Sequence, residues 1–352
     1  MLWLVESLGE ELAAGLVGLL VGIVFGIAAQ RSRFCLRASA VEFARFQLGP
    51  RMSVWFLTFS TAVIWTQSAE LLGIITASDA RIMSVPGSYS GAIIGGLIFG
   101  VGMILARGCS GRLLVLAATG NLRSVMNGLV FAVFAQMALN GWLAPMRNTL
   151  AGLWTTSGGS NVHLLDALHL PTGSGLALGL VFAASAFVLS HRNRIGYGRL
   201  VMASGVGFSI ALGWIMTSLL ASVSFDPVTV QSATFTGPSA NTLMYFLSSD
   251  PVLKFEIGLV PGVFIGAFLS AFVAREFQLQ GFDGAAPMRR GMIGSAMMGF
   301  GGMLAGGCAI GNGVTGTSIF VQTAWIALLF MWIGAILADR LIDQRMRVQA
   351  TS

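Results

Sequence analysis

Charged residues are scarce in this sequence. Lys, Arg, Asp and Glu make up 10% of its 352 residues, whereas hydrophobic residues make up 55% and the mean hydropathy is +0.81. So few charges cannot cover the surface of a water-soluble protein, but the apolar length suffices for repeated crossings of a lipid bilayer. The composition excludes a soluble globular protein and predicts an all-α integral membrane protein.

Cysteine and histidine are also rare, with three residues of each. The chain has no Cys-x-x-Cys pair, no histidine beside a cysteine, and no acidic residue within a few positions of Cys109 or Cys308. These absences argue against a disulfide framework, a dithiol relay, a cysteine nucleophile activated by histidine, and a metal site. We expect no metal, no cofactor and no enzymatic activity.

Basic residues are absent before the first apolar segment, which is preceded by Glu6, Glu10 and Glu11. A cleaved signal peptide has the opposite polarity, so we expect this segment to be retained. The net charge of +6 could suggest a nucleic-acid partner, but nearly all of the positive charges are arginines set between apolar segments. Because that arrangement is typical of membrane proteins, we expect no nucleic-acid partner.

The chain is rich in apolar segments of about 20 residues, the length that spans a bilayer. Nine can be read, at 12–30, 52–76, 88–106, 122–143, 173–190, 200–222, 252–274, 290–306 and 323–341. If the chain crosses at each, seventeen basic residues fall on one side and only Arg81, Arg147 and Lys254 on the other. Since basic residues collect on the cytoplasmic side, we predict a periplasmic N-terminus and a cytoplasmic C-terminus.

Four connecting segments do not read as ordinary loops. They pair small or polar residues with an apolar run too short to cross, and they lie at 31–46, 108–120, 234–248 and 306–320. Such segments suit re-entrant backbone, which is tolerated in a membrane only against protein or a wet cavity. We expect about four re-entrant segments, and we expect them to line a pathway.

A duplicated motif relates the two ends of the chain. Leu-Ala-x-Gly-Cys occurs at 105–109 and at 304–308, with the cysteines 199 residues apart (308 − 109). Five predicted spans separate the copies, an odd number, so the copies would enter from opposite faces as an inverted repeat. This predicts two halves, 1–143 and 200–341, joined by the span 173–190. The same offset carries Cys35 to Thr234, in a segment that also contains Thr236, Ser239 and Asn241.

All three cysteines fall in the Gly-flanked re-entrant segments. A thiol at the start of a half-helix would lie among free backbone N–H groups at the positive end of the helix dipole, and nearby arginines would add to that field. Such a site favours an anion that carries a soft atom. The candidate binding residues are Cys35, Cys109, Cys308, Gly108, Gly307, Ser110, Asn312, Arg33, Arg107, Ser239 and Asn241. Arg33 and Arg107 could equally serve as anchors at the headgroups.

At these residues the chain resembles the YeeE/YedE family of bacterial inner-membrane transporters for thiosulfate and related sulfur compounds. The resemblance rests on the segments 30–39, 96–112, 237–243, 274–280 and 291–313, and it extends over nearly the whole chain. Two details differ: Ser32 stands where the family often has glycine, and Arg107 where it often has a small residue. The resemblance implies an hourglass-like helical bundle in which Cys35, Cys109 and Cys308 pass thiosulfate inward through transient S–H···S contacts.

The function expected on this basis is uptake of thiosulfate, or a closely related sulfur anion, across the bacterial inner membrane. The expected partners are that anion, membrane lipid and a cytoplasmic acceptor of the sulfurtransferase type. Two alternatives stay open at this point. One is a membrane sulfur-transfer enzyme that uses a cysteine persulfide, and the other is a channel for small solutes in which the cysteines are incidental.

Overall fold

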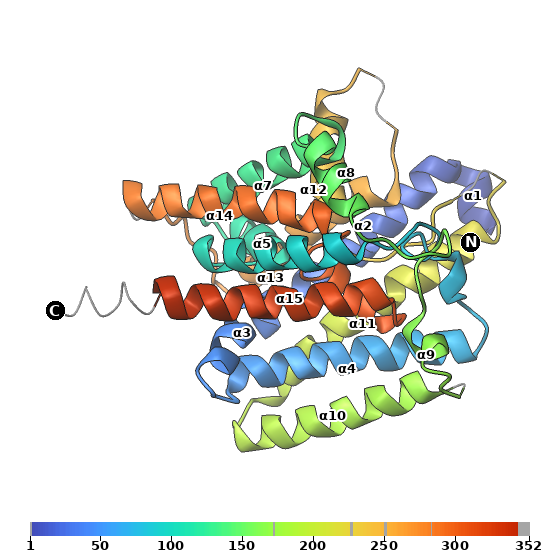
Figure 1. The fold of residues 1–352 in the computed structure, drawn as a ribbon, viewed down its shortest axis with the longest axis horizontal. Helices are drawn as coiled ribbons and strands as arrows, with labels where there is room; N and C mark the ends of the chain where they lie inside the picture. The colour runs from blue at the N-terminus through green and yellow to red at the C-terminus, as the bar shows by residue number, and fades with distance from the viewer. Residues whose placement is uncertain (1, 172, 226–227, 250–251, 283, 344–352) are drawn as a thin grey trace.

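The computed structural model describes residues 2–171, 173–225, 228–249, 252–282 and 284–343. Its long helices coincide with the nine predicted spans, and most run along the horizontal axis of Figure 1. They are α2 (Glu10–Ser32), α4 (Pro50–Leu71), α5 (Tyr89–Leu105), α7 (Leu122–Asn140), α10 (Ser174–Arg192), α11 (Tyr197–Ala221), α13 (Phe255–Val273), α14 (Ala285–Leu304) and α15 (Gln322–Ala338). The predicted all-α membrane fold is confirmed.

Among the described residues, seven helical stretches are long and apolar enough to cross a membrane. Helices α4 and α14 fall short, since α4 carries a series of Ser and Thr residues and α14 carries Arg289, Arg290 and several glycines. Both nevertheless pack along other long helices, α4 against α10 and α11, and α14 against α5 and α7. The count of nine spans therefore stays a prediction for these two helices.

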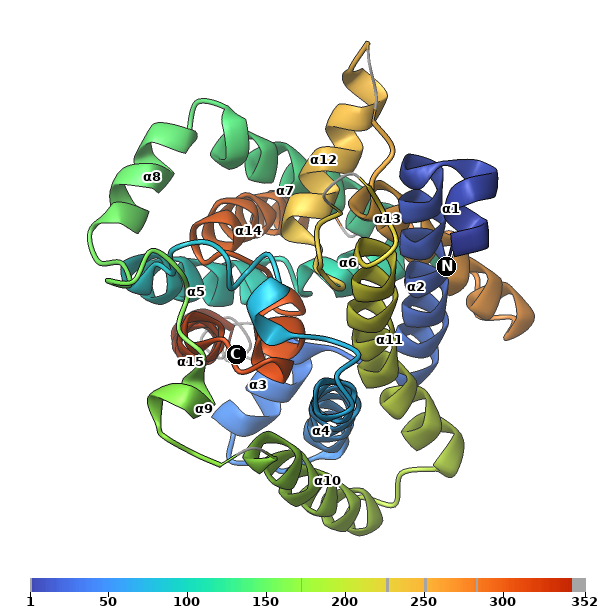
Figure 2. The ribbon, with the colours of Figure 1, turned by 90° about the vertical axis from the view of Figure 1, so that its right-hand side faces the viewer.

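Shorter elements fill the connections. They are α1 (Leu2–Leu8), α3 (Leu36–Ala44), η1 (Ala77–Asp79), α6 (Ser110–Ala118), α8 (Ala144–Gly152), α9 (Leu164–Ala167), α12 (Thr236–Leu247), η2 (Gly311–Gly316) and η3 (Asp339–Asp343). Four of them, α3, α6, α12 and η2, occupy the segments predicted to re-enter the membrane. Seen end on in Figure 2, α3 and α6 lie inside a ring of long helices that includes α2, α4, α11 and α15. The first three are α-helices, whereas η2 is wound as a wider π-helix.

Glycines bring the long helices into backbone contact. Helix α2 presents Gly22 to the Leu259 carbonyl of α13, and α13 presents Gly262 to the Leu19 carbonyl of α2; a Cβ at either glycine would overlap that oxygen. The glycine nine residues before each cysteine makes the same kind of contact: Gly26 with α13, Gly100 with α15 and Gly299 with α7. Packing of small residues without a side-chain layer therefore fixes the helices that end at the cysteines.

The contacts between long helices recur in matched pairs. If elements are matched in order, α2, α4, α5 and α7 correspond to α11, α13, α14 and α15. Helix α2 packs on α13 as α11 packs on α4, and α5 packs on α15 as α14 packs on α7. Each of these contacts joins one half to the other, so the halves interleave rather than meet at a single plane.

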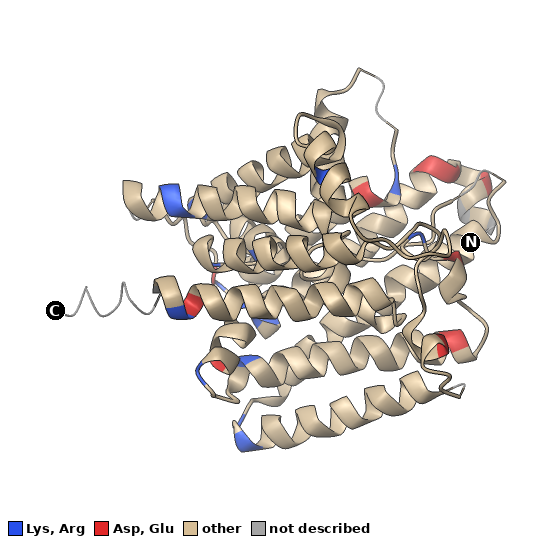
Figure 3. Cartoon of the chain, in the orientation of Figure 1, with Lys and Arg blue, Asp and Glu red and all other residues tan. Residues whose placement is uncertain are grey.

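Basic residues gather at one end of the bundle. In Figure 3 the ends of α10 and α15 and the start of α14 carry Lys or Arg on the left, and acidic residues of the N-terminal helices lie on the right. Of the basic residues assigned to this end by the sequence, Arg345 and Arg347 lie outside the described residues. The separation agrees with the arginine bias in the sequence.

Candidate functional site

The three cysteines occupy equivalent places in the backbone. Each follows closely after a long helix, and each precedes a short one: Cys35 and Cys109 are the residues immediately before α3 and α6, and Cys308 lies three residues before η2. The long helices end in the same way, because Gly108 donates to the Met103 carbonyl and Gly307 to the Gly302 carbonyl, both at i−5. The local backbone therefore delivers each thiol to the start of a short helix.

Cys35 and Cys109 form a thiol pair. Their side chains are close enough to affect each other electrostatically, and both cysteines are free rather than joined in a disulfide. The backbone N–H of Ala38 faces the Cys35 thiol and that of Arg112 faces the Cys109 thiol, although neither reaches the geometry of a full helix-cap hydrogen bond. The guanidinium of Arg112 interacts electrostatically with both thiols. This pair is therefore set in a positive field.

Cys308 has a different set of partners. Its Sγ accepts hydrogen bonds from the backbone N–H of Phe235, at 3.3 Å, and of Gly311, at 3.4 Å. The hydroxyl Oγ1 of Thr234 lies 3.8 Å from the same sulfur. Cys308 is also close enough to Cys109 to interact with it electrostatically. Cys308 is therefore paired with the hydroxyl of Thr234, whereas Cys35 and Cys109 are two thiols close to each other.

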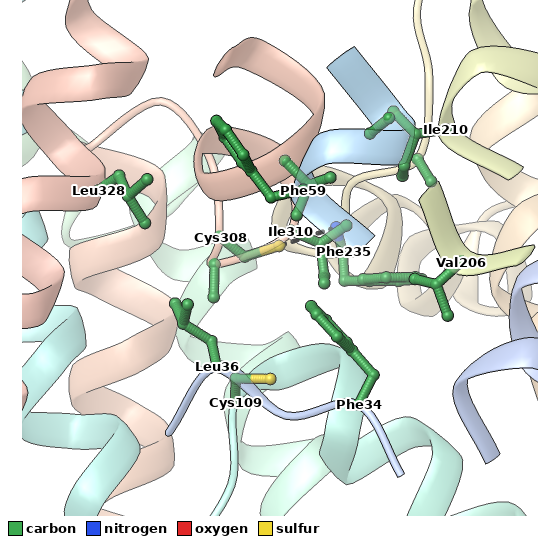
Figure 4. Packing of buried hydrophobic residues seen from close by; sticks show 14 of the residues in the cluster. Phe34, Leu36, Phe59, Cys109, Val206, Ile210, Phe235, Cys308, Ile310 and Leu328 are labelled. Carbon is green, nitrogen blue, oxygen red and sulfur yellow. Dashed lines mark hydrogen bonds between the residues drawn. The ribbon is translucent and has the colours of Figure 1, made fainter. Parts of the chain in front are cut away.

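A layer of apolar side chains surrounds the thiols. Phe34, Leu36, Phe235 and Ile310 are each at most 4% exposed, and Cys109 and Cys308 are almost as inaccessible. Figure 4 shows Cys308, Ile310 and Phe235 facing Cys109, Leu36 and Phe34 across this layer. In the layer a substrate would lose most of its water, so the polar hydrogens that the thiols and amides offer would be its main partners.

A cavity of about 330 Å³ opens on one side of this layer. We call it the Arg81 cavity. Its wall includes Arg81, Arg147, Trp214, Thr234, Thr236, Gly307, Gly311 and Asn312. Thr234 and Gly311 line the cavity and contact Cys308, so that thiol lies directly behind the cavity wall.

A second cavity of about 310 Å³ opens on the other side. We call it the Arg112 cavity, and it is lined by Gln30, Arg33, Arg112, Leu116, Thr119, Arg275, Glu276 and Gln278. Arg112 connects it to the pair Cys35 and Cys109.

The two cavities lie at opposite ends of α13. Arg81 pairs with Glu256 in the first turn of that helix, with 2.8 Å between Nη1 and Oε1, whereas Arg275 and Glu276 follow its last turn. Helix α13 has 19 residues and is about 28 Å long. The cavities share no lining residue, and the cysteine layer lies between them. The described residues thus form two separate cavities near opposite ends of α13, and we call the cysteine layer the waist.

Two predicted site residues at the waist differ in what their side chains do. The side-chain amide of Asn312 donates to the carbonyls of Ala305 and Gly307, at 3.0 and 2.9 Å, and so holds the turn before Cys308. Ser110 is buried beside Cys109, and its hydroxyl has no partner in the described chain.

The remaining predicted residues lie farther out. Arg33 lines the Arg112 cavity and pairs with Glu276 at 3.5 Å. Arg107 is exposed at the end of α5 and lines neither cavity. Ser239 and Asn241, on α12, also line neither cavity, and Asn241 donates to the buried Glu256. The structure thus brings together the cysteines and their flanking residues, but not Arg107, Ser239 or Asn241.

Two residues at the waist were not among the predicted binding residues. Arg112 follows Cys109 by three residues, and its guanidinium acts electrostatically on the thiols of Cys35 and Cys109. Thr234 contacts Cys308, and the offset that carries Cys35 to position 234 could have identified it. No group of three or more His, Cys, Asp or Glu side chains that could hold a metal ion occurs in the described residues.

Comparison with known proteins agrees with this architecture. The family described as Sulphur transport matches residues 31–337. The thiosulfate transporter TsuA of Escherichia coli (strain K12) is 27% identical over 361 residues, covering 94% of this chain and 95% of its own length. The thiosulfate transporter TsuA of Spirochaeta thermophila is 27% identical over 346 residues, covering 90% of this chain and 96% of its own. With a family match over most of its length and a multi-pass helical fold, the chain belongs to the sulphur transport family, the YeeE/YedE transporters that its cysteine segments resemble.

Proposed function

We propose that this protein takes up thiosulfate, or a closely related sulfur anion, across the bacterial inner membrane, with its N-terminus in the periplasm and its C-terminus in the cytoplasm. The single observation that carries the proposal is the position of the three thiols, in a closed layer between two cavities at opposite ends of α13. The names of both TsuA relatives support thiosulfate as the substrate.

The proposed path begins in the Arg81 cavity, which would face the periplasm. There the anion meets Cys308, whose thiol is fixed by the amides of Phe235 and Gly311. It then passes to Cys109 and Cys35 and leaves beside Arg112. At each station a thiol hydrogen-bonds the terminal sulfur, while backbone N–H groups at the short helix face the oxygens. No covalent bond changes.

The halves 1–143 and 200–341 are proposed to be an inverted repeat, with α3, α6, α12 and η2 as its re-entrant segments. The matched contacts of α2 with α13 and of α11 with α4 support this arrangement. On the cytoplasmic side, the Arg112 cavity would release the anion to a sulfurtransferase-type acceptor. Lipid would surround the exposed faces of the long helices.

Uptake of intact thiosulfate by proteoliposomes tests the proposal. With both sulfur atoms carrying different isotopic labels, we expect the two labels to enter the lumen in a one-to-one ratio. Entry of one label only, together with a persulfide on the protein that turnover requires, would establish the sulfur-transfer enzyme instead. Uptake unchanged when all three cysteines are replaced by alanine would establish the small-solute channel.

A further inference from the structure

Two buried polar groups in the wall of the Arg81 cavity have no hydrogen-bond partner in the described chain. They are the indole Nε1–H of Trp214, on α11, and the hydroxyl of Thr236, the first residue of α12. The two residues are 3% and 1% exposed. A buried donor without a partner costs free energy, because it loses its hydrogen bonds to water and gains none in return. Each group therefore lacks a hydrogen-bond partner, and each belongs to a residue that lines the cavity.

The cavity carries positive charge. The guanidinium of Arg81 is balanced by Glu256, but that of Arg147 donates only to the amide oxygen of Asn148, and no carboxylate in the described residues pairs with it. Burial lowers the pKa of Arg147 from its usual value. Because the usual pKa of a guanidinium is far above neutral, the group stays protonated near neutral pH. The charge balance of the cavity wall thus favours an anion.

One of the two donors, Thr236, is close in the chain to the residue that contacts the first thiol of the path. Thr236 is two residues from Thr234, whose hydroxyl lies 3.8 Å from Cys308 Sγ. Indole N–H and hydroxyl groups suit the hard oxygens of an oxyanion, whereas a thiol suits a polarisable sulfur. An anion with oxygens at one end and sulfur at the other could use both sets of groups at once.

We propose that Trp214 and Thr236 bind the sulfonate-like oxygens of the substrate in the Arg81 cavity and so orient its terminal sulfur toward Cys308. This inference deepens the proposed function and rests on it. Recognition then has two separate parts. The cavity selects a tetrahedral oxyanion, and the thiol layer selects the sulfur. A tetrahedral oxyanion without a terminal sulfur, such as sulfate, enters the first part and is not passed on.

Isosteric substitutions test the first part. Trp214→Phe keeps an aromatic ring and removes the N–H, and Thr236→Val keeps the shape and removes the hydroxyl. In equilibrium binding of thiosulfate to the full-length protein in detergent, we expect each variant to raise the dissociation constant about tenfold, the effect of losing one hydrogen bond to an ion. Sulfate should compete with thiosulfate for the wild-type protein, but wild-type proteoliposomes should not accumulate it.

The chain offers a matched control for each substitution. Trp55 and Thr66 are also buried and also lack a partner in the described chain, but they line neither cavity. Trp55→Phe and Thr66→Val should bind thiosulfate like the wild type. If all four variants lose affinity equally, the loss reports general damage, and the proposal is overturned.

Two other outcomes would also overturn it: unchanged affinity in both Trp214→Phe and Thr236→Val, or failure of sulfate to compete. Thiosulfate uptake by the wild-type protein tests the proposed function separately from the inference. If wild-type proteoliposomes take up thiosulfate while the cavity variants bind it normally, only the inference about Trp214 and Thr236 fails. If the wild type takes up no thiosulfate, the proposed function fails, whatever the binding results.

Discussion

The hydroxyl of Thr234 lies 3.8 Å from the Cys308 thiol, and these two residues are 74 positions apart in the chain, as are Cys35 and Cys109. The offset that relates Cys109 to Cys308 also relates Cys35 to Thr234. The waist therefore contains two matched pairs, one of two thiols and one of a thiol and a hydroxyl. The pairs differ in polarity, because an oxygen is a harder hydrogen-bonding partner than a sulfur.

This relationship predicts a difference between two substitutions of Thr234. Thr234→Ser keeps the hydroxyl beside Cys308 and should preserve thiosulfate uptake. Thr234→Val keeps the shape but removes the hydroxyl, and uptake should fall about tenfold if the hydroxyl orients the thiol or the anion. Initial rates in proteoliposomes at matched protein content measure the effect. Equal rates in the two variants would show that the hydroxyl has no part in transport.

Replacement of the thiols should strongly reduce transport without unfolding the protein. Serine is nearly isosteric with cysteine, but it offers a hard, strongly hydrated oxygen in place of a polarisable sulfur, and alanine offers no donor. We expect Cys109→Ser and Cys308→Ser to lower uptake by about tenfold or more. Alanine at the same positions should lower uptake at least as much. Substitutions of Cys35 should have the same effects. Size-exclusion profiles should match the wild type. Near-wild-type uptake in both alanine variants would contradict a thiol relay.

Arg112 and Arg107 should differ in their effect on uptake. Arg112 lies beside the Cys35 and Cys109 thiols and lines a cavity, whereas Arg107 is exposed and lines neither cavity. We expect Arg112→Gln to slow uptake at low thiosulfate concentration, and Arg107→Gln to have the smaller effect. Because exposed charges are screened by salt, any effect of Arg107→Gln should shrink as salt is added. A larger loss of uptake in Arg107→Gln than in Arg112→Gln would indicate that Arg107, and not Arg112, attracts the anion.

The glycine contacts between α2 and α13 should be intolerant of side chains. A Cβ at Gly22 would overlap the carbonyl oxygen of Leu259, so Gly22→Val forces the two backbones apart. Overpacking of this kind typically costs about 1–3 kcal/mol or more, and we expect a lower melting temperature and less folded protein. Gly128→Ala is the control, because a Cβ at Gly128 on α7 meets no atom within 4 Å. A drop in melting temperature for Gly128→Ala as large as that for Gly22→Val would contradict the contact argument.

The orientation can be read with fused reporters. A reporter placed after Arg347 should report a cytoplasmic position, and one inserted near Asp166 a periplasmic position, because of the arginine bias between the two sides. Alkaline phosphatase and green fluorescent protein fusions give opposite signals on the two sides. Both sites on the same side would contradict the nine-span topology and with it the inverted repeat.

Sequence patterns predicted the positions of the helices better than they predicted which side chains would be in contact. The helices could be located because apolar length is a local property, and the short helices because Gly-rich segments with brief apolar runs are local as well. The three cysteines were found through a duplicated motif. Helices α4 and α14 are not among the stretches that hydropathy identifies as spans, since α4 carries a series of Ser and Thr residues and α14 carries arginines and glycines.

The contacts of Arg112 and Trp214 illustrate what the sequence could not provide. Arg112 is one of several arginines near the cysteines, and only the start of α6 directs it toward the thiols rather than toward the headgroups. Trp214 lies in the middle of an apolar span, where an aromatic residue ordinarily indicates packing. Whether its N–H has a partner depends on the path of the segment between α11 and α12. That path is held by a hydrogen bond from Ser232 to the Ile210 carbonyl of α11 and by one from Thr315 of η2 to the Ala233 carbonyl.

The closed layer of Phe34, Leu36, Phe235 and Ile310 has a consequence for the cell as a whole. Among the described residues, none lines both cavities, so a hydrated ion that left one cavity for the other would meet this apolar layer. Shedding its hydration shell in an apolar layer costs far more than thermal energy. A closed layer of this kind would let a membrane that contains many copies keep the voltage across it.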